Sequence, residues 1–241
     1  MVGERDMVRI FDRNMFIMTL AIMAGFVVIT YFIADIAHQS QIQELNSAFT
    51  SEIENIEQNN IYFTSSFLES SVILDSARED RAYGNYHFDL AELFYTSALS
   101  EDNETRMNTY KTNCLVNCTE ALPEYYNANQ NFLLAANYFE NTKQYTNFSN
   151  YITLLSLYVN LTESGARLVL LRYNATIYLS QIAEKIVFEE EGVVLDNATE
   201  LLDLLNETMM AYGGEMGTFN KIQDEIDEYG IEGFSPIREF T

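Results

Sequence analysis

An uncharged apolar run near the start of the chain is followed by a long stretch in which apolar residues recur every three or four positions. The run covers Asn14–Ala34, 21 residues without a charged side chain. An α-helix rises about 1.5 Å per residue, so this length matches the roughly 30 Å hydrocarbon core of a bilayer. The pattern therefore predicts a transmembrane helix over residues 14–36, preceded by a short cytoplasmic segment over 1–13.

Over residues 37–80, the apolar positions keep a helical spacing, with Gln, Glu and Ser between them. The resulting stripe is narrow, and a narrow stripe is typical of a helix that docks on a partner helix. We expect a membrane-proximal stalk helix that reaches about Ala77. Its predicted partner-facing residues are Ile42, Leu45, Phe49, Ile53 and Ile56.

The remaining residues, 81–241, are predicted to form one extracytoplasmic helical bundle. Glycine is unfavourable inside a helix, so we interpret Gly84-Asn85, Ser164-Gly165 and Gly213-Gly214 as helix breaks. The breaks separate expected helices over 86–100, 123–145, 148–161, 167–188, 197–211 and 218–229. The predicted fold class is all-α: a transmembrane helix that continues into the stalk, followed by the bundle.

Two of these helices have expected start signals. Pro123 suits the first turn of a helix, where its missing N–H leaves no hydrogen bond unmade. Asp196 is expected to cap the helix that begins near Asn197. The apolar helix over 167–188 contains Arg172 and Lys185, so we expect it in the bundle core and not in a second membrane span.

The positive residues predict the orientation of the anchor. Arg5, Arg9 and Arg13 precede the apolar run, and the next Lys or Arg is Arg78. Positive residues stay in the cytoplasm, so we expect the C-terminal part outside the cell. A cleaved signal peptide is the alternative. The apolar run exceeds the usual core of about 7–15 residues and lacks a small-x-small cleavage site, which favours an uncleaved anchor.

Seven Asn-x-Ser/Thr sequons support the same orientation, because N-glycans are added outside the cytoplasm. The asparagines beyond position 100 would give about two such matches by chance, and the first hundred residues contain no sequon. We expect glycans at exposed positions. The candidate sites are Asn103, Asn117, Asn147, Asn160, Asn174, Asn197 and Asn206.

Cys114 and Cys118 are the only cysteines. An even number of cysteines in an exported domain favours a disulfide between them. On a helix, a spacing of four puts the Cα atoms about 6 Å apart, near the upper limit for a bridge, so a looped segment would suit it better. A structural zinc site would need a second cysteine pair or paired histidines at ligand spacing.

The charge balance excludes one class of partner. The chain has 13 Lys and Arg against 36 Asp and Glu, a net charge of −23, and a phosphate backbone would be repelled. We therefore expect no nucleic-acid binding. The 16 Tyr and 16 Phe supply apolar area for a folded core, and we expect a minority of them at a protein interface.

Catalytic patterns are missing from the sequence. His38 and His87 are the only histidines, and neither has a partner at the spacing of a metal site or catalytic triad. Acid clusters at 189–191 and 224–228 lack the spacing of an EF-hand loop, so we expect solvated surfaces. The sequence predicts a protein that is not an enzyme and holds no cofactor or metal.

Three functions remain open at this point. The leading hypothesis is a structural or interaction subunit in the cell membrane, whose partners are the lipid bilayer and other membrane or cell-surface proteins, further copies of itself included. The second is an extracytoplasmic ligand-binding or sensor domain that acts through a partner. The third is a filament subunit that resembles type IV pilins, whose long apolar helix also runs into an external domain. This chain departs from the pilin pattern because no Gly processing site precedes its apolar run and no Glu lies early within the run.

Overall fold

The computed structural model describes residues 4–190 and 192–229, without the side chains of 4–22, 24–29 and 34. The chain is almost entirely helical, which confirms the predicted all-α class. A two-stranded hairpin is inserted between the last two helices. The elements in order are α1 (Glu4–Leu99), α2 (Glu104–Thr142), the 3-10 turn η1 (Lys143–Tyr145), α3 (Ser149–Glu184), β1 (Ile186–Glu189), β2 (Gly192–Leu195) and α4 (Thr199–Glu228).

The chain forms two compact units, residues 1–58 and 59–241, and α1 contributes to both. In the first unit every described side chain is exposed. The predicted cytoplasmic segment, 1–13, and most of the predicted transmembrane segment, 14–36, lie outside the residues whose side chains are described. Among the described residues, no helix contains a stretch both long and apolar enough to cross a membrane.

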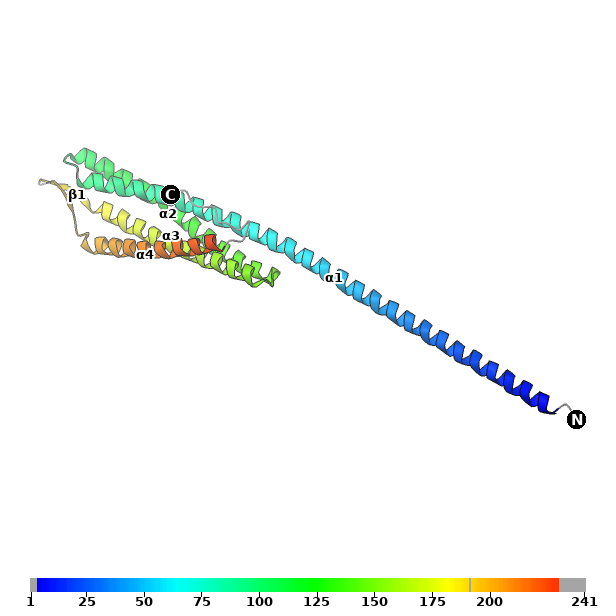
Figure 1. Cartoon of the computed structure of the whole chain (residues 1–241). Helices are drawn as coiled ribbons and strands as arrows, with labels where there is room; N and C mark the ends of the chain where they lie inside the picture. Colours follow the sequence, from blue (N-terminus) through cyan, green and yellow to red (C-terminus); the bar gives the residue numbers. More distant parts are fainter. Residues whose placement is uncertain (1–3, 191, 230–241) are drawn as a thin grey trace. The chain divides into compact units, whose positions relative to one another are not determined.

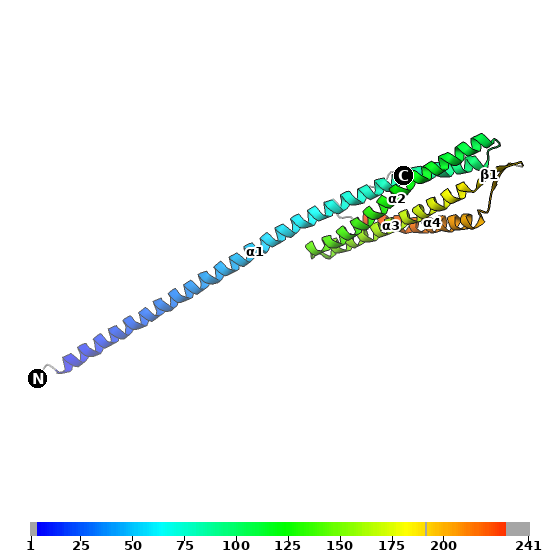
Figure 2. The same ribbon diagram turned by 180° about the vertical axis from the view of Figure 1, so that it is seen from behind.

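The second unit is a four-helix bundle. Figures 1 and 2 show α2, α3 and α4 side by side with the last part of α1, and β1 at one end of the bundle. A seven-residue period in α1 lines this core, as in coiled-coil packing. Its buried members are Phe63, Ser70, Ala77, Gly84, Ala91 and Ala98.

Aromatic rings fill the core at the end of the bundle where α2 meets α3. The Phe139 ring stacks on the Tyr158 ring at 4.8 Å between centroids, and Phe67 of α1 meets both rings edge-on at 5.7 and 5.5 Å. These three helices are therefore joined by one aromatic cluster, because each pair of rings adds specific contact beyond the burial of area.

Two of the predicted glycine breaks are wrong because the glycines provide close packing inside continuous helices. Helix α1 continues through Gly84, and a Cβ at this position would lie 2.8 Å from the Tyr125 ring. Helix α3 continues through Gly165, where a Cβ would lie 2.5 Å from the Phe132 ring. Each helix accepts the unfavourable propensity of glycine because an aromatic ring of α2 needs the space.

The predicted break at Gly213-Gly214 is also wrong, for a different reason. Helix α4 runs through both glycines to Glu228, and a Cβ at either would touch nothing within 4 Å. The helix is held on both sides of the glycines, since Tyr212 and Phe219 pack on arginines of the bundle. Tertiary packing here outweighs a local cost of about 1 kcal/mol per glycine.

Two predicted helix starts are wrong. Helix α2 begins at Glu104 and not at Pro123, because the Asn103 side chain caps it by accepting a hydrogen bond from the backbone N–H of Arg106 (3.1 Å). Pro123 lies inside α2. Asp196 does not cap α4, whose N-cap is Ala198 without a side-chain hydrogen bond.

The predicted helix over 167–188 ends earlier, at Glu184, and the hairpin follows. Residues Ile186 and Leu195 pair at its base, and Glu189 pairs with Gly192, whose φ of 120° favours glycine. Lys111 Nζ donates to the carbonyls of Glu184 and Ile186, both at 2.9 Å. The Lys111 cation thus lies at the C-terminus of α3, where the helix dipole favours positive charge, and links this helix end to the first residue of β1.

Candidate functional site

The five predicted partner-facing residues of the stalk are all solvent-exposed. Their exposed fractions run from 43% to 75%, for Ile42, Leu45, Phe49, Ile53 and Ile56. They lie in the first unit, residues 1–58. We call these five residues the stalk stripe. An aligned row of large exposed apolar side chains is typical of an interaction surface.

The stalk stripe continues the seven-residue period of the bundle. Ile42, Phe49 and Ile56 precede Phe63 by multiples of seven residues, and Phe63 is the first buried member of the core row. The same sequence repeat is therefore covered by helices in the second unit and uncovered in the first. A heptad repeat that continues beyond its own bundle is the pattern of a helix that packs on a further helix.

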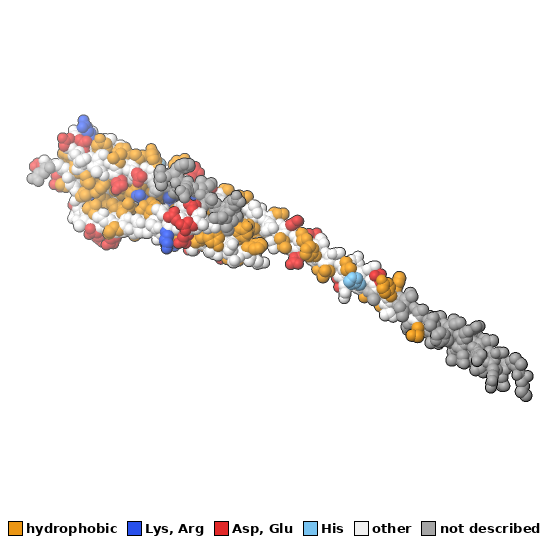
Figure 3. All heavy atoms as spheres, viewed as in Figure 1, with side chains coloured by type: hydrophobic (Ala, Val, Ile, Leu, Met, Phe, Trp, Pro, Cys, Tyr) orange, Lys and Arg blue, Asp and Glu red, His pale blue; other side chains and the backbone are white. Residues whose placement is uncertain are grey.

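The charges beside the stalk stripe are all negative. In residues 37–58 they are Glu44, Glu52, Glu54 and Glu57, and the sequence has no Lys or Arg from 14 to 77. On the face seen in Figure 3, this part of α1 shows orange apolar and red acidic side chains and no blue ones. Two stalks in contact would therefore place acidic side chains near one another.

Most sequon asparagines lie at the surface of the bundle. Asn174 is half-buried, and five others are exposed: Asn103, Asn147, Asn160, Asn197 and Asn206. Asn103 also caps α2 with its side chain, and Asn197 has a left-handed backbone with φ of 52°. The structure tests neither glycan occupancy nor export, so both remain predictions.

Asn117 is the sequon that the folded bundle leaves little room to glycosylate. Its side chain is buried, and its Nδ2 donates to the Asn113 carbonyl at 2.9 Å. Its Oδ1 lies 3.1 Å from His87 Nδ1, and the same ring nitrogen lies 3.1 Å from a carboxylate oxygen of Glu120. Asn117 thus contacts α1 through Oδ1 and its own helix through Nδ2, and a glycan on the buried Nδ2 would disturb this packing.

The two cysteines are free and buried in α2, so the predicted disulfide is not formed in this structure. They lie one turn apart on a continuous helix, where the Cα separation disfavours a bridge. The hydrogen bond from Cys118 lowers the pKa of the Cys114 thiol against the effect of burial. The same hydrogen bond, together with burial, raises the pKa of Cys118.

A cluster of arginines inside the bundle, with Arg81 buried and Arg172 half-buried, is the feature that the sequence did not reveal. Arg172 of α3 lies between two rings, with its Cζ 4.4 Å from the centroids of both Phe88 and Tyr212. Arg81 of α1 lies over the ring of Phe219 at 5.0 Å. These cation–π contacts join α4 to α1 and α3, and each is stronger where water is excluded.

The position of Arg81 along the sequence already indicated that this arginine faces the core. Arg81 falls in one row with Leu74, Ala77 and Phe88, at the steps of three and four that define the buried face of α1. Arginine is rarely a core residue, so a core predicted from apolar residues alone does not include it. A chain with a net charge of −23 thus keeps two basic side chains, Arg78 and Arg81, buried in its interior.

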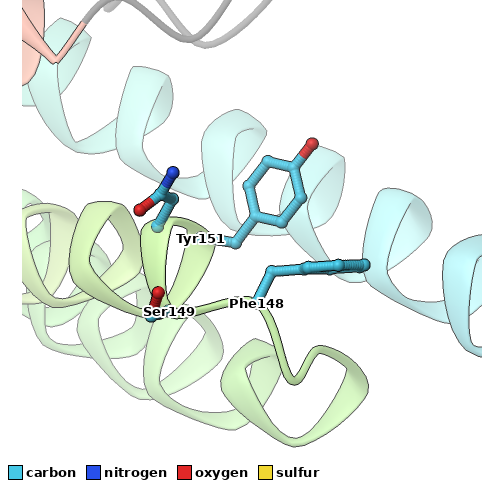
Figure 4. Close-up of a pocket in the computed structure, with 4 residues that line it drawn as sticks. Phe148, Ser149 and Tyr151 are labelled. Carbon is cyan, nitrogen blue, oxygen red and sulfur yellow. The ribbon is translucent and has the colours of Figure 1, made fainter.

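A shallow pocket of about 380 Å³ lies at the start of α3, lined by Phe148, Ser149, Asn150 and Tyr151. Figure 4 shows the rings of Phe148 and Tyr151 close to each other; their centroids are 5.9 Å apart. Tyr151 also packs against Phe63 of α1 at 5.4 Å. The lining supplies two hydroxyls, those of Ser149 and Tyr151, one amide and backbone groups, with no acid or base beside them.

Glu189 and Glu190, from the predicted solvated cluster at 189–191, lie where the hairpin turns, and Glu191 lies outside the described residues. The cluster at 224–228 lies near the end of α4. Within the residues that the structure describes, no three His, Cys, Asp or Glu side chains come together as metal ligands would.

Comparison with known proteins gives no relative: the chain matches no protein-family model, no curated protein and no solved structure.

Proposed function

We propose that this protein is a structural or interaction subunit of a cell-surface or membrane protein assembly. In this proposal, residues 14–36 anchor it in the membrane, the stalk stripe binds a partner, and the glycosylated bundle lies outside the cell. The observation that carries the proposal is the exposure of all five stalk-stripe residues. Leaving such a row in water costs free energy that a partner helix would recover, at about 25 cal/mol per Å² covered.

The exposed residues of the predicted anchor support the membrane part of the proposal. Met23, Tyr31, Phe32 and Ile33 are each at least 63% exposed. Side chains of this size are usually buried in protein or in lipid. Tyr31 and Phe32 would lie at the outer end of the segment, where aromatic rings favour the membrane interface.

The positions of the sequons support an outer location for the bundle. Six of the seven asparagines are at least partly exposed, and they occur on α3, on α4, at the start of α2 and in the loops before α3 and α4. Glycans at these sites would lie on or beside α2, α3 and α4, whereas α1 has no sequon along its whole length. The stalk stripe, which lies on α1, therefore stays bare of glycans for a protein partner.

The experiment compares the full-length protein with a stripe variant, both extracted from native membranes in a mild detergent. The variant is Ile42→Ser/Phe49→Ser, and the readout is the mass of the particle by light scattering. We expect the unchanged protein in a complex larger than its glycosylated monomer and the variant as a monomer. The matched control is Ser47→Ala/Ser51→Ala, which changes the opposite side of the same helix and should leave the mass unchanged.

A monomeric particle for the unchanged protein would contradict the proposal. So would a complex that the stripe variant leaves intact, because the partner would then bind elsewhere.

A further inference from the structure

The outer face of α1 in the bundle carries a second row of exposed apolar residues, distinct from the stalk stripe. Their spacing places them within an arc of roughly 80° at about 100° per residue, on the side away from the buried row. They span about 48 Å of helix at about 1.5 Å per residue. We call this row the outer face; its members are Ile61, Leu68, Val72, Tyr83, Tyr86 and Leu93, each at least 55% exposed.

The exposed Asp, Glu, Lys and Arg side chains that α1 itself places beside the outer face are all acidic. The only basic residues in 59–99 are Arg78 and Arg81, and both are buried on the inner side of the helix. The acidic residues of the same segment are Glu69, Asp75, Glu79, Asp80, Asp89 and Glu92, each at least partly exposed. A second copy of this face would repel it, whereas a basic surface would match it.

A pocket of about 560 Å³ interrupts the outer face, lined by Glu79, Ala82, Tyr83, Tyr86 and His87. It combines two exposed tyrosine rings with a carboxylate. An arginine guanidinium stacks on aromatic rings and pairs with a carboxylate in the same site. His87 is held from behind by Glu120 at 3.1 Å, so the wall of the pocket is anchored to α2.

We propose that the outer face of α1 binds a basic amphipathic helix of another protein. Its apolar stripe would cover Leu68 and Val72, and one of its arginines would enter the pocket between Tyr83, Tyr86 and Glu79. Laying the apolar side of a helix on a complementary surface is a common mode of recognition. This surface lies in the bundle and not in the stalk, so the two proposals succeed or fail separately.

The experiment places a photoreactive benzophenone amino acid at Leu68 of the full-length protein in its native membranes. Ultraviolet light joins it to whatever covers the face, and mass spectrometry identifies the joined segment. The matched control carries the same group at Met210, which is 71% exposed on α4 and outside the outer face. We expect a product at Leu68 whose partner segment belongs to another protein and combines a helical apolar stripe with an excess of Arg and Lys.

Four other products would overturn the proposal: a second copy of this chain, residues 230–241 of the same chain, lipid, or a segment of another protein without that basic stripe. A yield at Leu68 no higher than at Met210 would also overturn it, because the face would then be uncovered.

Pocket variants test the role of the arginine. Tyr83→Ala and Glu79→Gln should each lower the crosslinking yield at Leu68, and we expect affinity for the identified segment, made as a peptide, to fall about tenfold. Leu170→Ala removes an exposed apolar side chain on α3 and serves as the control. Equal yields and affinities in all three variants would exclude the pocket from the contact. Circular dichroism before crosslinking verifies that each variant is folded.

Discussion

Buried polar side chains fix how the helices of the bundle meet. The Tyr125 hydroxyl donates to Asn85 Oδ1 at 2.9 Å, and Ser66 and Thr142 are joined through their hydroxyls at 2.6 Å. Burial raises the pKa of Tyr125, against the charge of the nearby Arg172, which lowers it. Each such pair must be formed in the bundle, because an unpaired buried polar group costs about 1–3 kcal/mol.

Cys114 and Cys118 are both buried on one helix. We therefore expect a thiol reagent to modify them slowly in the folded protein. After denaturation without reductant, the same reagent should modify two thiols per chain. No reactive thiol after denaturation would show that the disulfide favoured by the sequence forms after all, and that α2 is distorted between the two residues.

Tyr158 predicts how stability depends on alkaline pH. Burial raises the pKa of Tyr158 from its ordinary 10.0 to about 12, against the charge of Arg78, which lowers it. A raised pKa in the folded state contributes stability that is fully present below pH 10 and is lost as the pH rises toward 12. Urea titrations between pH 10 and 12 should show that the free energy of unfolding falls less with rising pH in Tyr158→Phe than in the unchanged protein. Tyr126→Phe, at an exposed site, should behave like the unchanged protein.

Arg172 holds α4 to the bundle through two ring contacts. We expect Arg172→Ala to lower the free energy of unfolding by about 2 kcal/mol, since both cation–π contacts and the packing of the side chain are lost. Arg106→Ala removes an exposed arginine whose ion pair with Glu101 is long, at 3.9 Å, and should change it by less than about 0.5 kcal/mol. If denaturant titrations gave the same loss of unfolding free energy for Arg172→Ala and Arg106→Ala, the arginine cluster would not hold α4 to the bundle.

At the scale of elements, helix α4 depends on a few anchoring contacts at its inner face. Only Phe219 and Ile226 are buried within it, and its ion pair with α3 joins Arg167 to Glu215 at 3.0 Å. Burial raises the pKa of Glu215, but hydrogen bonds from Arg167 and Ser164 outweigh it, so the pKa is lowered overall. This contact therefore strengthens α4 docking at neutral pH and weakens as the carboxylate is protonated in acid.

Replacing two helical glycines by alanine should change the stability of the bundle in opposite directions. Gly165→Ala should destabilise the bundle by about 1–3 kcal/mol, because the added methyl group would meet the Phe132 ring. Gly214→Ala should stabilise it by about 0.5–1 kcal/mol, because that site is open and alanine favours helix. Denaturant titrations of both variants check the pair, and a stabilising Gly165→Ala would contradict the close packing of α2 on α3.

The helices could be predicted from the sequence because their apolar residues repeat with helical spacing, as in Ile42 to Ile56. Helix ends could not, because a glycine that breaks a helix and one that admits a ring look alike until its neighbour is known. Gly165 and Phe132 are 33 positions apart in the sequence. The hairpin was missed because its apolar residues, Ile186 to Phe188, directly continue the apolar pattern of α3. The exposed stalk stripe was found because its narrowness is visible in sequence, whereas the exposure of the outer face depends on which side of α1 the bundle covers.

At the scale of the whole molecule, helix α1 carries one row of residues that is buried and others that are exposed to solvent. The row from Phe63 to Ala98 is buried in the bundle, while the stalk stripe, in the same period, is exposed. The 36 acidic residues favour solubility through mutual repulsion, and under the proposed function the exposed apolar rows supply the specific contacts with partners. The central claim is that the stalk stripe is covered by a partner in the native membrane.

The most direct test measures the accessibility of the stalk in intact membranes. Leu45→Cys places a thiol on the stalk stripe and Ser51→Cys places one on the opposite side of the helix, while the native cysteines stay buried. We expect a membrane-impermeant maleimide to label Leu45→Cys at least about tenfold more slowly in intact membranes than in the dissociated, purified protein. Ser51→Cys should react at the same rate in both. Equal rates for Leu45→Cys in the two settings would mean that no partner covers the stripe, and would contradict the proposed function.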